Sequence, residues 1–395
     1  MTNKSISVYM PPHAFWTLKV SGVSRYVCEL TQQLLSKRVQ VHIPIKNTPN
    51  ENLKTAPFFS VTSKEEPTAS LFWSILSHLF SLTKYREKFR RQVKRDQAMR
   101  YMRKHTFDII HPTHNNAIEI LPYIHDTPLV ITVHDMTHEL FPSSFASNDP
   151  SSKRKKMFVE KADRIIAITE CTKNDLIRLF NVSPEKIDVI HHGNSLTLPS
   201  DHNQINLSCP QRYVLFVGKR QGYKNFTRFV KSFAIIAKND PTLELVCAGG
   251  GKFTSEEREF LKSLGLEHRT HQKWVTDTEL AILYNRSLCF VYPSEYEGFG
   301  LPILEAFECK TPVLCANSSC FPEVAGKAAL YFSPHDEKEM AQRISEVINN
   351  KMLRESLIQA GKERLKNFSW EKCAELTLLT YQKAISKKID SVPTY

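Results

Sequence analysis

Ser294 to Glu305 reads SEYEGFGLPILE, and this stretch decides the fold of the second half of the chain. The run before it, Leu288 to Tyr292, is short, apolar and aromatic, which predicts a buried parallel strand that ends at Pro293. Two glycines in the loop allow the main chain to approach a ligand closely. The helix that follows would direct its first N–H groups at the same ligand.

Two carboxylates, Glu297 and Glu305, lie eight positions apart around this helix start. Carboxylates accept hydrogen bonds from neutral hydroxyls, whereas a helix N-terminus favours an anionic group. A sugar attached to a phosphate offers both kinds of group. The alternative is a strand-to-helix turn with ordinary surface glutamates.

A second segment, Gly218 to Phe226, reads GKRQGYKNF and follows the apolar strand YVLFV. We expect Arg220 and Lys224 at the mouth of a cleft. A guanidinium binds phosphate oxygens bidentately and an ammonium adds a compact point charge, so the pair would neutralise a diphosphate leaving group. Taken alone, the segment could also be a solvated basic loop.

The two segments resemble the E-x7-E signature and the V-G-x-R-x-x-Y-K-N loop of the retaining glycosyltransferases of family 4, which have the two-domain GT-B fold. The resemblance covers almost the whole chain apart from roughly residues 46 to 104, and it is weaker at HHGNS from His191. Further similar segments are KADRIIAITECTKNDL from Lys161, CAGGGK from Cys247 and FPEVAGKAALYF from Phe321.

This resemblance implies roles for individual residues. Glu297 contacts the donor sugar, Glu305 holds the ribose, and Arg220 and Lys224 stabilise the leaving diphosphate. The other residues implied in binding the nucleotide sugar are mostly backbone groups: Gly22, Gly218, Ser294, Phe299, Gly300 and Leu301.

His134 follows the predicted strand PLVITV, in the segment HDMTHELFP. A histidine at the carboxyl end of a strand can donate to a sugar hydroxyl, and the resemblance places it beside the donor sugar. The alternative is a structural histidine that caps the loop. The spacing to His138 superficially suggests zinc, but the segment leaves a strand and continues with Asp135 rather than glutamate, so no metal site is expected.

Ser21 to Tyr26, SGVSRY, leads into the first long helix. The backbone at Gly22 could approach the donor phosphate, helped by the helix N-terminus. The family usually has two glycines here, whereas this chain has one. An ordinary helix start with Ser24 as its N-cap is the alternative.

The chain has 395 residues, enough for two domains with full cores. Its 9 cysteines form no C-x-x-C pair, which indicates cytosolic thiols rather than disulfides or zinc. No signal segment and no apolar run near the roughly 20 residues of a membrane span is found, so we expect a cytoplasmic protein, soluble or peripheral at the inner face of the membrane.

Strands and helices are predicted to alternate in both halves, which favours an α/β fold with two Rossmann-like, doubly wound parallel-sheet domains. The predicted strands are 6–10, 108–111, 129–133, 165–168 and 187–190 in the first half, and 213–217, 243–246, 288–292 and 312–315 in the second. We expect a first, acceptor-side domain at 1–195, a linker at 196–212 and a nucleotide-sugar domain at 213–368. A C-terminal helix within 369–395 is expected to cross back to the first domain, as the resemblance implies.

The divergent insert at 46–104 combines an apolar stripe from Leu71 to Val93 with ten Lys or Arg and two acidic residues between Lys84 and Lys104. A basic amphipathic helix of this kind fits an anionic membrane surface. The alternative is a helix that packs on the first domain with a solvated basic side. The net charge of +12 also suggests nucleic-acid binding as a function, but the sequence contains no recognised nucleic-acid-binding motif.

These observations favour a retaining, metal-independent glycosyltransferase, because no Asp-x-Asp triplet is present and cationic groups are. The first candidate reaction transfers mannose from GDP-mannose to a saccharide or lipid-linked acceptor in surface polysaccharide or lipopolysaccharide synthesis; a UDP-hexose is the second donor. No cofactor beyond the donor substrate is expected. A nucleotide-sugar epimerase or phosphorylase of the same fold would also fit the motifs, as would a noncatalytic sugar-binding or membrane-docking protein.

Overall fold

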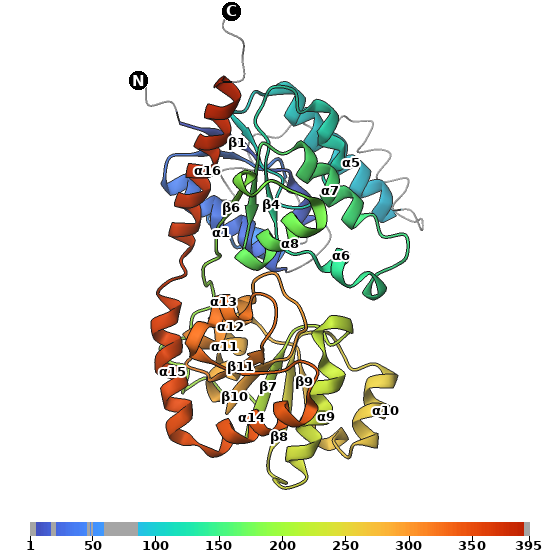
Figure 1. Ribbon diagram of the computed structural model, residues 1–395, viewed down its shortest axis with the longest axis vertical. Coiled ribbons are helices and arrows are strands. Elements are labelled where there is room, and N and C mark those ends of the chain that lie inside the picture. Colours follow the sequence, from blue (N-terminus) through green and yellow to red (C-terminus); the bar gives the residue numbers. More distant parts are fainter. Residues whose placement is uncertain (1–4, 17–20, 46–47, 49, 59–85, 391–395) are drawn as a thin grey trace, which may run out of the picture.

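The computed structural model consists of two α/β halves stacked along the long axis of the molecule (Figure 1). It describes residues 5–16, 21–45, 48, 50–58 and 86–390. Much of the insert, including the apolar stripe before position 86, therefore lies outside the described residues.

The first half contains two three-stranded parallel sheets, ordered β2-β1-β3 and β4-β5-β6, which a single bridge between Ile110 and Leu129 joins. Its strands are β1 (Ser7–Tyr9), β2 (Gln40–His42), β3 (Ile109–Ile110), β4 (Val130–Val133), β5 (Arg164–Ala167) and β6 (Ile187–Val189). Its helices are α1 (Gly22–Ser36), α2 (Glu51–Lys54), α5 (Arg86–Lys104), α6 (Thr137–Leu140), α7 (Ser151–Lys161) and α8 (Glu170–Phe180), with short 3-10 turns η1 (Pro12–Phe15), η4 (Ile118–Tyr123), η5 (Pro142–Ser144) and η6 (Pro184–Lys186).

The second half is built on one six-stranded parallel sheet of order β12-β11-β10-β7-β8-β9. The strands are β7 (Tyr213–Val217), β8 (Glu244–Ala248), β9 (Thr270–Lys273), β10 (Cys289–Tyr292), β11 (Val313–Ala316) and β12 (Ala329–Phe332). The helices are α9 (Phe226–Ala237), α10 (Ser255–Ser263), α11 (Asp277–Arg286), α12 (Leu301–Glu308), α13 (Phe321–Ala325), α14 (Glu337–Asn349) and α15 (Lys351–Leu365), with 3-10 turns η7 (Gly222–Lys224), η8 (Glu267–Arg269) and η9 (Gly326–Ala328).

Most of the strands that were predicted from apolar runs are inner ones. β10 (CFVY) and β11 (VLCA) are buried at every position, because helices cover both faces of a parallel sheet. Prediction missed β2 (QVH), β9 (THQK) and β12 (ALYF), which are edge strands with partly exposed residues. An edge strand needs no continuous apolar run, so its sequence carries a weaker signal.

The strand order of the second half reverses between β7 and β10, which are neighbours in the sheet. Ligands of open parallel sheets bind outside the carboxyl ends of the strands at such a switch point. The segment from Gly218 follows β7 and the segment from Ser294 follows β10. The topology therefore brings the two sequence motifs to one place.

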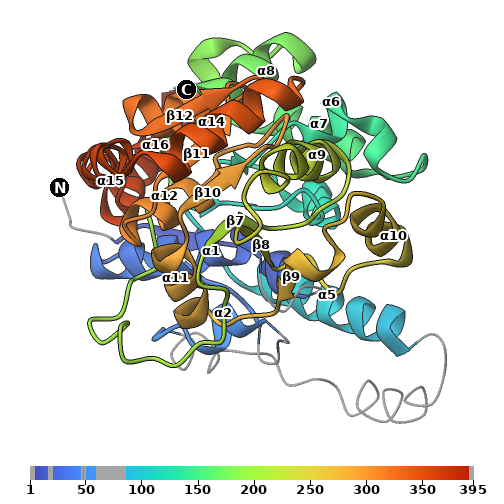
Figure 2. The same cartoon turned by 90° about the horizontal axis from the view of Figure 1, so that it is seen from below.

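The last helix, α16 (Trp370–Asp390), returns to the first half and packs against α1 (Figure 1). Its Trp370, Cys373 and Tyr381 belong to the core formed by β1 and α1. Tyr381 shares a hydrogen bond of 2.7 Å with Nδ1 of His111. Figure 2 shows α16 and the basic helix α5 on opposite sides of the molecule.

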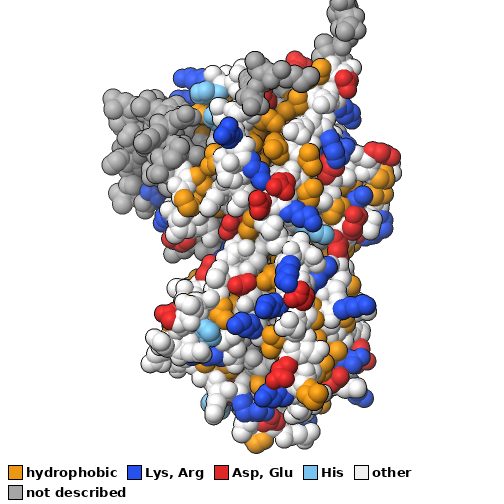
Figure 3. Space-filling model, turned by 90° about the vertical axis from the view of Figure 1, so that its left-hand side faces the viewer, with side chains coloured by type: hydrophobic (Ala, Val, Ile, Leu, Met, Phe, Trp, Pro, Cys, Tyr) orange, Lys and Arg blue, Asp and Glu red, His pale blue; other side chains and the backbone are white. Residues whose placement is uncertain are grey.

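None of the helices in the described part of the chain is both long and apolar enough to cross a membrane. On the face that carries α16, basic and acidic side chains are interspersed (Figure 3).

Candidate functional site

The two motifs meet in an ion pair. The Nζ of Lys224 lies 2.5 Å from Oε1 of Glu297, and the two side chains are 19% and 13% exposed. Burial alone would lower the pKa of Lys224, but the adjacent Glu297 carboxylate leaves that pKa raised. Lys224 is therefore a protonated cation at neutral pH, held at the switch point of the sheet.

The loop between β10 and α12 depends on glycine. Gly300 is the residue before α12 and has φ +89°, a left-handed conformation that other residues rarely adopt. The N–H of Glu297 donates to Oγ of Ser319 at 3.2 Å, and the Phe299 ring is buried. The Oγ of Ser294 is fully buried and has no hydrogen-bond partner among the described residues.

Gly298 presses the same loop onto the first half of the molecule. A Cβ atom at this position would lie 1.7 Å from the carbonyl oxygen of His134, which follows β4. The hydroxyl of Thr169 donates to the Gly298 carbonyl at 3.0 Å. Close beside it, the Tyr296 hydroxyl donates to Asp175 of α8 at 2.8 Å. The two halves are thus closed on each other at the predicted donor loop.

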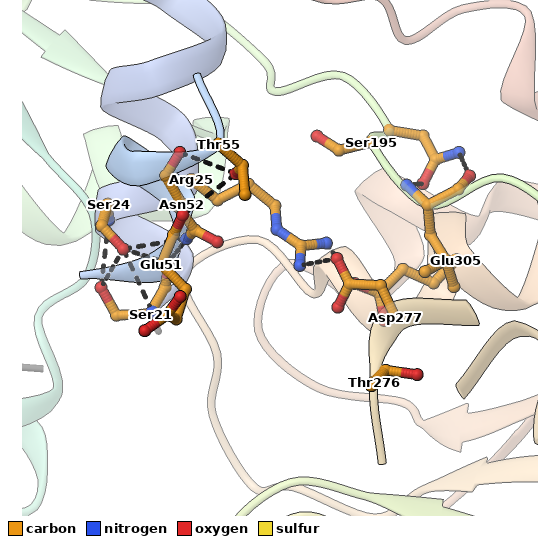
Figure 4. A network of polar contacts seen from close by, with 12 residues as sticks. Ser21, Ser24, Arg25, Glu51, Asn52, Thr55, Ser195, Thr276, Asp277 and Glu305 are labelled. Carbon is orange, nitrogen blue, oxygen red and sulfur yellow. Dashed lines mark hydrogen bonds and ion pairs between the residues drawn. The ribbon is translucent and has the colours of Figure 1, made fainter. Parts of the chain in front are cut away.

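Glu305 lies on α12 and is the second carboxylate of the motif. Its Oε2 accepts a hydrogen bond of 3.1 Å from the Tyr284 hydroxyl, and its Oε1 lies 3.7 Å from Nη1 of Arg25. Burial raises the pKa of Glu305, and the Arg25 guanidinium opposes this shift. Arg25 also pairs with Asp277 at 2.7 Å (Figure 4).

The start of α1 differs from the predicted alternative. Ser21, not Ser24, is the N-cap; its Oγ accepts from the Ser24 N–H, and Ser24 returns a bond to the Ser21 N–H. The helix therefore begins at Gly22, three residues earlier than expected, because this capping box satisfies its first donors. A Cβ at Gly22 would lie 3.7 Å from Leu301, so these two predicted ligand residues face each other across the junction.

Arg220 does not reach the cleft mouth where it was expected. Its side chain is 2% exposed and donates bidentately to the Glu257 carboxylate of α10, at 2.8 and 3.0 Å. It also donates to the carbonyl oxygens of Gly249, Gly251 and Lys252. The neighbouring Lys219 is exposed. The sequence places Arg220 in the correct loop, but its partners come from positions that no local pattern reveals.

His134 lies at the carboxyl end of β4 and lines a cavity of about 110 Å³ with Thr113, Asn115 and Lys155. Burial is the main cause that lowers its pKa to about 4, so the ring is neutral at pH 7. Nε2 is 3.0 Å from the Thr113 carbonyl, which places the ring hydrogen on Nε2. Nδ1 is then an acceptor, which reverses the expected donation of a hydrogen bond to a sugar.

His138, the other histidine of the spacing that suggested zinc, stacks its ring on Phe145 with centroids 3.9 Å apart. Across the described ranges, no group of three or more His, Cys, Asp or Glu side chains could hold a metal ion.

Sequence reasoning assigned no role to Arg25, Asp277 or Tyr296, which all act across the junction of the two halves. Arg25 was part of the quoted segment SGVSRY, and Tyr296 was part of SEYEGFG. A cation one turn after a predicted phosphate loop was a usable signal. Asp277 carried none, because its partner lies 252 positions away.

Two family models match the chain in succession. "Glycosyltransferase Family 4" matches residues 20–197 and "Glycosyl transferases group 1" matches residues 199–364. Among curated proteins, O-antigen chain mannosyltransferase B of Escherichia coli is 29% identical over 271 residues, covering 64% of this chain and 70% of that protein. O-antigen chain mannosyltransferase RfbU of Salmonella typhimurium is 32% identical over 228 residues, covering 56% and 63%. A D-inositol 3-phosphate glycosyltransferase of an Arthrobacter species is 27% identical over 281 residues, covering 67% of each.

Solved structures match nearly the whole chain. Sucrose-phosphate synthase from Thermosynechococcus elongatus has a TM-score of 0.72 at 19% identity and covers 97% of this chain and 100% of its own. HepE of Anabaena, in complex with UDP and glucose, has a TM-score of 0.69 at 17% identity and covers 98% and 100%. At these identities the likeness establishes a shared fold.

Proposed function

Because this chain belongs to the family 4 glycosyltransferases and has their GT-B fold, we propose that it moves a hexose from a nucleotide diphosphate sugar to an acceptor hydroxyl with retention of configuration. The observation that carries the proposal is the Lys224–Glu297 ion pair at the switch point of the second sheet. It joins a phosphate-binding cation to a sugar-binding carboxylate, the two groups that a sugar phosphate requires.

Lys224 would stabilise the negative charge that develops on the leaving diphosphate, together with the N-terminus of α12 behind Gly300. Glu297 would accept a hydrogen bond from a donor-sugar hydroxyl, and Glu305 from the ribose. The transfer is proposed to need no metal, since these groups supply positive charge to the diphosphate. No cofactor beyond the donor substrate is proposed.

Arg220 is proposed to act on the diphosphate through the loop that it holds, because a direct contact would require its guanidinium to leave Glu257. The exposed Lys219 is the cation of that loop that stays available. His134 is proposed to accept a hydrogen bond from a sugar hydroxyl through Nδ1. The acceptor is proposed to be a hydroxyl of a saccharide or lipid-linked saccharide, bound on the side of the first half.

Mannose from GDP-mannose is the first candidate donor, in synthesis of a surface polysaccharide, since two relatives are O-antigen chain mannosyltransferases. A UDP-hexose is the second candidate, supported by the similar fold of HepE, which was solved with UDP and glucose. Helix α5, which carries exposed Arg90 and Arg100, is the proposed contact with an anionic membrane at the cytoplasmic face.

The test is acceptor-dependent release of nucleoside diphosphate. A panel of nucleotide sugars is screened by thermal stabilisation, and the best donor is then incubated with saccharide acceptors in the presence of excess EDTA. Release of the diphosphate only with acceptor, retained in EDTA, supports the proposal. Release without acceptor, or a strict need for added Mn²⁺ or Mg²⁺, contradicts it. Lys231→Ala serves as the control for Lys224→Ala, because Lys231 pairs with Glu337 on the outside of the same half.

A further inference from the structure

Arg25 is the one side chain in the described part of the chain that forms an ion pair with Glu305. It projects from the first turn of α1 in the first half toward two carboxylates of the second half, Asp277 of α11 and Glu305 of α12 (Figure 4). Its side chain is 14% exposed and that of Glu305 is 13% exposed, whereas Asp277 is 63% exposed. Arg25 therefore forms two ion pairs: a solvent-exposed one with Asp277 and a largely buried one with Glu305.

The start of α1 holds Arg25 in this position. The capping box of Ser21 and Ser24 closes the first turn, and the Arg25 N–H donates to the Ser21 carbonyl at 3.0 Å. The Asn52 side chain donates to Ser24 Oγ at 3.0 Å and to the Ser21 carbonyl at 3.3 Å, which ties the turn to α2. A side chain on such a supported turn loses little freedom when it binds.

Arg25 favours the ionised form of Glu305, in which both carboxylate oxygens accept hydrogen bonds. The groups that face it are Arg25 from α1, and Tyr284 and Asp277 from α11. Burial and the like charge of Asp277 both favour a protonated Glu305, and Arg25 opposes them. A protonated carboxyl would present a hydrogen in place of one acceptor oxygen to the hydroxyls of a ribose.

We propose that Arg25 is a positioning residue of the donor site: from the first half it holds the Glu305 carboxylate ready for the ribose of the nucleotide, so that the donor site is complete only when the two halves are closed. This inference rests on the proposed function, because it takes Glu305 as the ribose ligand. Domain closure and nucleotide binding then support each other.

The experiment measures GDP affinity by calorimetry and the donor KM and kcat between pH 6 and 9. Arg25→Gln is expected to weaken GDP binding and raise the donor KM roughly tenfold at pH 7, the scale of a lost charged hydrogen bond. The loss should shrink as pH rises, because hydroxide then ionises Glu305 without help from Arg25. Arg25→Lys, which keeps the charge, should fall between Arg25→Gln and the unchanged protein.

Lys37→Gln is the matched control, because Lys37, the residue after the last turn of α1, forms its ion pair with Glu375 of α16 and makes no contact with the second half through that pair. It should leave GDP affinity unchanged. Wild-type affinity and pH dependence in Arg25→Gln, or equal losses in Arg25→Gln and Arg25→Lys, would overturn the inference. Glu305→Gln separates the claim that Glu305 binds the ribose from the claim that Arg25 positions Glu305. If Glu305→Gln binds GDP as tightly as the unchanged protein does, the proposed ribose contact is wrong. If Glu305→Gln loses GDP affinity while Arg25→Gln does not, only the positioning role of Arg25 is rejected.

Discussion

Replacing Gly298 with Ala tests whether the closed contact between the two halves is required for activity. The φ angle of Gly298 lies outside the left-handed region, so alanine fits the backbone of the loop. The added Cβ would nevertheless lie 1.7 Å from the His134 carbonyl oxygen, where real Cβ atoms essentially never come closer than 3.0 Å. The loop and β4 must therefore separate by at least the difference, 1.3 Å.

The size of the effect follows from this separation. Overpacking of a closed contact costs about 1–3 kcal/mol. A misplacement of about 1 Å at reacting groups can cost on the order of 10²-fold in rate. We therefore expect kcat/KM of Gly298→Ala to fall roughly 10- to 100-fold. Each half should keep its own fold, since the substitution strains only their junction.

The assay compares kcat/KM, the melting temperature and the radius of gyration from solution scattering. Gly265→Ala is the control: it places a Cβ in open space at a glycine with φ +70°, so it introduces backbone strain without touching the junction. The control should lose some stability and keep its kcat/KM. Wild-type kcat/KM and an unchanged radius of gyration in Gly298→Ala would refute the closed contact as a requirement for catalysis.

Three further predictions concern charge. Lys224→Ala should lower kcat by about 10² or more. Arg220→Ala should lower the free energy of unfolding by about 3–5 kcal/mol in urea denaturation, because Glu257 would keep an unpaired buried charge; an unchanged free energy of unfolding in Arg220→Ala would contradict this. Changing Arg90 and Arg100 to Gln should reduce sedimentation with anionic vesicles at low salt, because exposed charges act over about 10 Å at 0.1 M. GDP affinity should stay unchanged. Undiminished sedimentation would favour a helix that packs on the first half and exposes its basic side to solvent. Burial lowers the pKa of His111 from 6.5 to about 3. As pH falls below 6.5, the unfolded chain therefore protonates this histidine while the folded protein does not, and the free energy of unfolding drops. Between pH 7 and 4.5, His111→Gln should lose less of its free energy of unfolding than the unchanged protein does; an equal loss would contradict the lowered pKa of His111.

The parallel, doubly wound fold was predictable because its inner strands are nearly continuous apolar runs, as in β7 (YVLFV) and β10. The meeting of Lys224 with Glu297 was also predictable in outline, since both motifs follow strands and the carboxyl ends of parallel strands share one edge. The strands β2, β9 and β12 were missed because they are partly exposed edge strands and need no such run.

Contacts between distant positions were beyond sequence reasoning. Arg220 was expected at the cleft mouth, but Glu257 of α10 lies where its guanidinium can be fully paired, and only the folded chain brings the two together. Whether His134 donates or accepts a hydrogen bond in the cavity depends on which of its ring nitrogens donates to the Thr113 carbonyl, and that contact is visible only in the folded chain. Arg25 gained its place at Glu305 from the closure of two halves, which no local pattern records.

The proposed donor site lies at the switch point of the second sheet, between the Lys224–Glu297 pair and Glu305. A crystal structure of the protein with bound GDP would test this location most directly. We expect diphosphate oxygens within hydrogen-bond distance of Lys224 and ribose hydroxyls on Glu305. GDP bound instead in the cavity beside His134 in the first half, with Lys224 still paired only to Glu297, would contradict this assignment.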